Sequence, residues 1–175
     1  AHHSLRFEKV VHDRPGEVRA IGYRMFSDDD LRRAFDWFSA RGESPEWVER
    51  PFQGLTLRII DAVGVPVEFT ATMPGPENRM RHFHTHAGGK LVFLDHVQVA
   101  THDVQAAFDW YTSIGFRLTE YTATDGSDEL WGVWLKRKNN TQDELYSHGA
   151  GPRLHHFAFH TPATANAIHG AAATA

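Results

Sequence analysis

Apolar residues recur along this chain in two patterns, one typical of strands and one typical of helices. Short alternating or apolar stretches, which we expect to form strands, cover residues 18–25, 93–100 and 154–160. The first two stretches each lead, through a polar cap, into a segment whose apolar residues have helical spacing. Gly42 and Gly115 follow these segments and are placed to end the two helices.

Further strand-like segments follow each predicted helix. They cover residues 56–60 and 66–70 after the first helix and residues 130–135 after the second. The chain therefore reads as a repeated unit of strand, helix and several strands, which is an α+β arrangement. Proline, glycine and polar residues concentrate between residues 73 and 89, and this stretch is expected to separate the units.

The repeat is also visible in the residues themselves. The tetrapeptide Ala-Phe-Asp-Trp begins at Ala34 and again 73 residues later at Ala107, and the same offset places Tyr23 on His96. A weaker third copy, beginning at residue 154, places His156 on His96. One strand histidine alone would favour a core or hydrogen-bonding role. Two histidines at equivalent positions of two copies favour a metal site.

Composition excludes several classes of function. The chain has 175 residues, enough for one ordinary domain or two small ones, and 41% of them are hydrophobic. A net charge of −4 without a basic stripe argues against binding to nucleic acid. The absence of cysteine excludes disulfides, iron–sulfur clusters and a thiol nucleophile, and no apolar run has the length of a membrane helix. We expect a cytoplasmic protein that binds neither nucleic acid nor a membrane.

Histidine is over-represented, with 13 in the chain. His82, His84 and His86 alternate, so on a strand they would share one face and could mimic a ligand set. They lie between proline-rich residues 74–76 and glycines at 88–89, which favours a linker. We therefore do not expect this trio to hold a metal.

Four short segments carry a family resemblance. They are Leu-Asp-His-Val-Gln at 94–98, Ile-Gly-Phe-Arg at 114–117, Trp134 followed by Lys-Arg-Lys at 136–138, and Gly-Pro-Arg-Leu-His-His-Phe-Ala-Phe at 151–159. Together they resemble type I extradiol ring-cleaving dioxygenases of the vicinal oxygen chelate superfamily. The resemblance covers almost the whole chain, and residues 152–159 are its most specific part.

The resemblance implies a fold of four βαβββ modules, two in each domain, with the metal held by the C-terminal pair. Residues 1–79 are then a non-catalytic module that ends the N-terminal domain, and residues 80–89 form a linker. Residues 90–175 belong to the metal-binding catalytic domain, which is incomplete at its C-terminus. The chain is therefore expected to be the middle of a longer protein.

The resemblance also implies a 2-His-1-carboxylate site that holds Fe(II), or alternatively Mn(II). His96 and His156 are the expected ligands in this chain, and the third ligand is a glutamate expected beyond Ala175. Glu68 lies in a context that resembles that glutamate's, but in the non-catalytic module, so it is not expected to bind the metal. Tyr23 is expected to occupy the metal-free counterpart of the His96 position.

Two positions depart from the family pattern. Gln142 stands where the family has its acid/base histidine, and Gln98 stands where the closest relatives have asparagine. A glutamine amide can form hydrogen bonds but cannot titrate near neutral pH. Proton transfer would then fall to His155, to a residue outside the chain, or to a substrate bound already ionised. Gln98 and Trp134 are the expected substrate contacts.

The implied activity is extradiol cleavage of a catecholic ring with O2. The expected partners are a catechol and O2, and the protein is expected to be a homo-oligomer, either a dimer or a tetramer. Two alternatives stay open at this point. One is a glyoxalase-like or isomerase enzyme of the same superfamily, which would use the metal without oxygen. The other is a metal-free module that only binds a small molecule.

Overall fold

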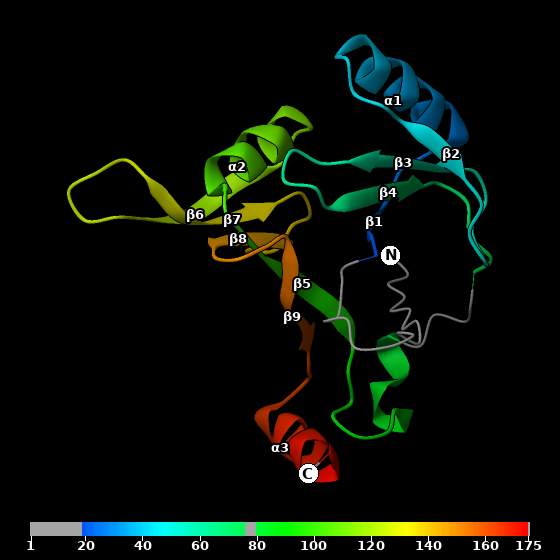
Figure 1. Ribbon diagram of the computed structural model, residues 1–175. Helices are drawn as coiled ribbons and strands as arrows, with labels where there is room; N and C mark the ends of the chain where they lie inside the picture. Colours follow the sequence, from blue (N-terminus) through cyan, green and yellow to red (C-terminus); the bar gives the residue numbers. More distant parts are fainter. Residues whose placement is uncertain (1–18, 76–79, 175) are drawn as a thin grey trace, which may run out of the picture.

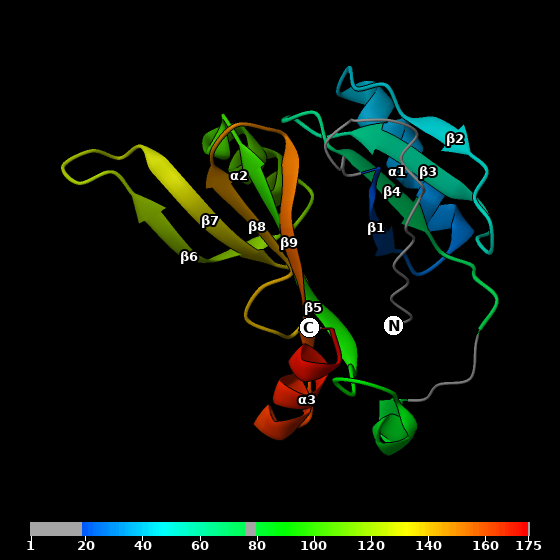
Figure 2. The same ribbon diagram turned by 60° about the horizontal axis from the view of Figure 1, so that its bottom comes forward.

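The predicted repeat of strand, helix and strands is present twice in the computed structural model, which describes residues 19–75 and 80–174 (Figures 1 and 2). The elements of the first unit are β1 (Ile21–Arg24), α1 (Asp28–Ala40), β2 (Glu46–Val48), β3 (Thr56–Ile60) and β4 (Pro66–Thr70). Its four strands form a sheet in the order β1-β4-β3-β2, in which β1 is parallel to β4 and the other pairs are antiparallel.

The second unit repeats this order and is joined by a strand of a third. Its elements are β5 (Phe93–Thr101), α2 (Val104–Ser113), β6 (Arg117–Ala123), β7 (Leu130–Lys136) and β8 (Glu144–His148), followed by β9 (Arg153–His160) and α3 (Thr164–Thr174). The sheet order is β6-β7-β8-β5-β9, with β5 parallel to β8 and antiparallel to β9. The predicted α+β fold of repeated βαβββ modules is confirmed.

Local sequence explains where the first two helices begin and end. The Ser27 hydroxyl accepts a hydrogen bond from the backbone N–H of Asp30 at 3.1 Å, and the Asp103 carboxylate accepts one from Ala106 at 2.8 Å. Both helices are followed by a glycine with positive φ, 79° at Gly42 and 94° at Gly115, which only glycine adopts at little cost. α1 packs against β3 and β4, and α2 packs against β7 and β8, so each helix covers one face of its sheet.

Three strands lack an apolar pattern that a sequence reading could detect. β2 has only three residues, β6 is exposed along almost its whole length, and β8 begins with a buried glutamate. In the chain segment that connects β4 to β5, residues 80–85 form a 3₁₀ helix, which lies within the predicted linker at 80–89. The domain limits at residues 79 and 90 stay a prediction.

None of the described helices is long and apolar enough to cross a membrane.

Aromatic side chains join the two units into a common core. Phe38 of α1 stacks on Trp110 of α2 with ring centroids 6.1 Å apart, and the Trp110 indole N–H donates to Glu43 at 3.0 Å. Tyr23 of β1 meets the edge of Phe116, just before β6, at 5.4 Å. The aromatic residues of α1 and α2 therefore serve mainly as core.

A buried polar cluster lies within this junction. The hydroxyls of Tyr111 and Tyr146 are 2.7 Å apart, and each lies 3.4 Å from the carboxylate of Asp61. Glu144 is 2% exposed, and neither its Oε2 nor the Tyr23 hydroxyl has a hydrogen-bond partner among the described residues. Burial raises the pKa of Glu144 to about 8, although the neighbouring Tyr23 hydroxyl acts to lower it. Burial therefore favours the protonated form of Glu144 at neutral pH.

We predict that Glu144 makes the fold less stable as the pH rises from 4.5, its ordinary pKa, to about 8. Its folded pKa exceeds its unfolded pKa, so its contribution is complete below 4.5 and is lost as the pH rises through about 8. The resulting slope reaches up to about 1.4 kcal/mol per pH unit. Glu144→Gln should remove this slope in urea unfolding measured across that range, and Glu129→Gln, at an exposed position, should not. Identical pH dependence in Glu144→Gln and the unmodified protein would contradict the prediction.

Candidate metal centre

The two predicted ligands lie on neighbouring strands and face each other. His96 is in the middle of β5 and His156 is in β9, which pairs with β5 in antiparallel register. Their Nε2 atoms are 3.1 Å apart, and the rings lie at 75° with centroids 5.2 Å apart. The sheet thus brings together two residues that are 60 positions apart in the chain.

The spacing of the two nitrogens fits a shared metal ion. An imidazole nitrogen binds a first-row divalent ion at about 2.1 Å, so two nitrogens in neighbouring octahedral positions lie about 3 Å apart. The observed 3.1 Å between the Nε2 atoms meets this requirement. Among the residues that the structure describes, no group of three or more His, Cys, Asp or Glu side chains is placed to hold a metal ion.

A carboxylate holds His96 in the ligating tautomer. Asp95 Oδ2 lies 2.8 Å from His96 Nδ1, so Nδ1–H donates to Asp95 and the lone pair of Nε2 faces His156. The side-chain amide of Gln142 also lies 2.9 Å from the same Nδ1. A protonated Nδ1 cannot accept from the amide nitrogen. Turning the Gln142 amide by 180° exchanges its nitrogen and oxygen. The amide oxygen then faces His96 Nδ1 and is a second acceptor for the Nδ1–H.

His156 is supported from the other side by its neighbour. Its Nδ1 lies 2.8 Å from Nδ1 of His155, so one of these nitrogens donates to the other. When His156 is the donor, its Nε2 keeps the lone pair that a metal would bind. Loss of hydration lowers the pKa of His156, and the nearby His96 and His155 lower it further. His156 is therefore held in the neutral form that binds metals.

The remaining predicted residues lie on the same face of the sheet. Residues that pair directly across neighbouring strands point their side chains to the same face of a sheet. Such a row crosses β9, β5, β8 and β7 and consists of His156, Gln98, Leu145 and Trp134. The Gln98 amide also donates to the Ser147 hydroxyl at 2.9 Å. Tyr146, which meets Tyr111 of α2, follows Leu145 and points to the opposite face. The candidate site therefore lies on the side of the sheet away from α2.

The equivalent position of the first unit holds no such arrangement. Tyr23 points its hydroxyl into the buried junction near Glu144. Glu68 is buried, and its Oε1 accepts from Arg50 Nε at 2.9 Å and from Nη2 at 2.5 Å. The His82, His84 and His86 trio belongs to the 3₁₀ segment and the turn after it, so the alternating strand face does not form.

Sequence reasoning did not select two acidic residues of this centre, Asp95 and Asp143. Asp95 adjoins His96, and on a regular strand adjacent side chains point to opposite faces. A break in the β5–β9 register between Leu94 and His96 allows Asp95 to reach the imidazole. Asp143 follows Gln142 in the chain and is buried. Nothing in its sequence context indicated a role.

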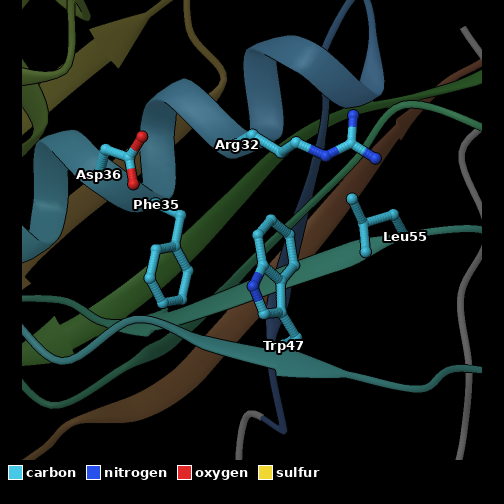
Figure 3. A pocket seen from close by; sticks show the side chains of 5 residues that line it. All are labelled: Arg32, Phe35, Asp36, Trp47 and Leu55. Atoms are coloured by element: carbon cyan, nitrogen blue, oxygen red, sulfur yellow. The ribbon is translucent and has the colours of Figure 1, made fainter.

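A hollow of about 400 Å³ lies in the first unit, between α1 and the edge of its sheet (Figure 3). Phe35 and Trp47 stack there with centroids 5.1 Å apart, beside Arg32, Asp36 and Leu55. None of the predicted site residues lines this hollow.

Residues 93–175 match the model of the Glyoxalase/Bleomycin resistance protein/Dioxygenase superfamily. Among solved structures, the chain is similar to homoprotocatechuate 2,3-dioxygenase from Arthrobacter globiformis, with 28% identity and a TM-score of 0.78 over 85% of this chain and 47% of that one. A variant of the Brevibacterium fuscum enzyme matches with 30% identity and a TM-score of 0.78 over 86% and 42%. No curated protein sequence matches the chain.

The complex of the Brevibacterium fuscum enzyme with 3,4-dihydroxyphenylacetate is also similar. Its identity is 30% and its TM-score is 0.78, over 86% of this chain and 48% of that one. The chain therefore spans less than half the length of these relatives, all of which are dioxygenases.

We predict that His96→Ala and His156→Ala will each weaken binding of a divalent ion by more than about 100-fold, because loss of a residue that only supports a ligand already costs 10- to 100-fold. Anaerobic titration of the intact protein with Fe(II), read by retained metal after desalting, measures the effect. His169→Ala removes an exposed histidine of α3 and serves as the matched control. Full metal retention by His96→Ala would contradict the assignment.

Proposed function

We propose that this chain provides two metal ligands of an extradiol ring-cleaving dioxygenase, because residues 93–175 match the model of the Glyoxalase/Bleomycin resistance protein/Dioxygenase superfamily. The observation that carries the proposal is the pair of Nε2 atoms, from His96 and His156, that face each other at 3.1 Å. Similarity to homoprotocatechuate 2,3-dioxygenases supports the reaction class.

The proposed cofactor is Fe(II), with Mn(II) as the alternative, since imidazole and carboxylate ligands suit both ions. His96 and His156 would hold it, together with the glutamate expected beyond Ala175. When bound, the metal would supply Lewis acidity toward a chelated catechol and a path for electrons between the catechol and O2.

The residues around the pair have roles that follow from their contacts. Asp95 keeps the Nδ1 proton on His96, and Gln142 braces the same ring from a second direction, so the ligand is oriented before metal binds. The Gln142 amide cannot accept a proton near neutral pH. His155 contacts His156 and is not itself a proposed ligand, and we assign proton transfer to it.

The proposed substrate is a catechol that lies on the face of the sheet occupied by Gln98 and Trp134. The Trp134 ring offers an apolar surface for a planar aromatic ring, and the Gln98 amide offers a hydrogen-bonding group next to the ligand pair. The chain contributes part of this surface, which would be completed by the rest of the intact protein.

Anaerobic loading of the intact protein with Fe(II), followed by addition of a catechol and O2, tests the proposal. We expect O2 uptake and a ring-cleaved product with both oxygen atoms incorporated, and neither with His96→Ala. Metal binding with turnover of a glyoxalase-type substrate but no O2 uptake would instead support an isomerase. Binding of the catechol without metal would support a binding module.

We predict that Gln142→His will add a titrating group beside the centre. The rate of ring cleavage or its pH dependence should then change, because a histidine at position 142 exchanges a proton near its ordinary pKa of about 6.5, in addition to His155, and an amide does not. Metal content should not change. Gln105→His, on the exposed face of α2, is the control and should leave the profile as it is. An unchanged profile in Gln142→His would show that position 142 does not take part in proton transfer.

A further inference from the structure

The loop between β7 and β8, residues 137–143, carries Gln142 to the candidate metal centre. Gln142 lies near its end, with its amide 2.9 Å from His96 Nδ1. Seven residues of irregular chain have polar groups that need partners if the loop is to hold one conformation. Two backbone N–H groups and two side-chain groups of this loop share one side chain as their partner.

That side chain is Asp143, which is 5% exposed. Its Oδ2 accepts from the backbone N–H groups of Arg137 at 2.6 Å and Lys138 at 2.8 Å. Its Oδ1 accepts from Lys138 Nζ at 2.8 Å and from the Asn140 amide at 3.0 Å. One carboxylate therefore binds donors from three residues of the loop.

The backbone of Asp143 ties the same loop to the strand of the ligand. Its carbonyl accepts from the N–H of Val97, the residue after His96, at 3.1 Å. Its own N–H donates to the carbonyl of Leu135 at 2.8 Å, which closes the loop at the end of β7. The Asn140 amide that binds Asp143 also donates to the Gln142 carbonyl. Gln142 is thus held between two anchored points.

The Asp143 side chain binds these donors as an ionised carboxylate. Burial alone would raise its pKa, but the Lys138 ammonium and the two backbone donors outweigh burial and lower the pKa. The carboxylate is therefore ionised at neutral pH and accepts from every donor that faces it. An asparagine at this position would turn an N–H₂ group toward one set of these donors.

We propose that Asp143 is a positioning residue for the metal centre, whose buried carboxylate folds the loop so that Gln142 stays against His96. The contact it controls joins two protein side chains, Gln142 and His96. Its consequence for catalysis rests on the proposed dioxygenase function. A side chain that acts through Gln142 in this way should affect the orientation of His96 as well as the stability of the fold.

The test is Asp143→Asn in the intact protein, with Asp128→Asn as control because Asp128 is exposed in the turn between β6 and β7. The ring ¹⁵N signals of His96, assigned by their loss in His96→Ala, report its hydrogen bonds without any metal. We expect Asp143→Asn to shift these signals toward those of Gln142→Ala and to weaken divalent-ion binding by about 10-fold or more. Asp128→Asn should change neither.

Asn140→Ala keeps the carboxylate and removes one of its donors, so it is the second variant if Asp143→Asn does not fold. A smaller shift of the same His96 signals is expected. Unchanged His96 signals in the folded variants would overturn the proposal. If the signals shift but the unmodified protein consumes no O2 with any catechol, the positioning role stands and the proposed dioxygenase function fails.

Discussion

The candidate site depends on the antiparallel pairing of β9 with β5. These strands belong to different copies of the repeated unit, and their hydrogen bonds place His96 and His156 with Nε2 atoms 3.1 Å apart. Among the described residues, neither histidine meets a further candidate ligand from its own unit. The histidine pair therefore forms where two units meet, and any change that shifted the register of β9 would separate the two nitrogens.

The sheet divides the chemistry of the second unit between its two faces. The face toward α2 carries Tyr146 and Glu144, which join Tyr111 in a buried polar cluster at the junction with the first unit. The other face carries the histidine pair with Gln98. Alternation along β5 and β8 lets each strand serve both tasks, because successive side chains point to opposite faces. Stability and site are thus built into the same strands.

The two acidic residues beside the pair act at different distances. Asp95 contacts the His96 ring directly and selects its tautomer. Asp143 contacts no histidine and instead organises the loop that delivers Gln142 to that ring. Both carboxylates bind donors that would otherwise be left unsatisfied near a site that needs a fixed geometry. The solved dioxygenases that resemble this chain are longer, and the chain spans less than half of their length.

The sequence by itself determined the repeat, the α+β class, the polar caps before the first two helices, and the histidine pair, because these depend on local pattern and on comparison of equivalent positions. It did not reveal the short or exposed strands β2 and β6, nor β8, where the buried Glu144 hides the apolar pattern. Tertiary structure alone decided the tautomer of His96. A strand irregularity at Asp95 and a loop folded on Asp143 place their groups at the ring, and irregular backbone has no periodic signature.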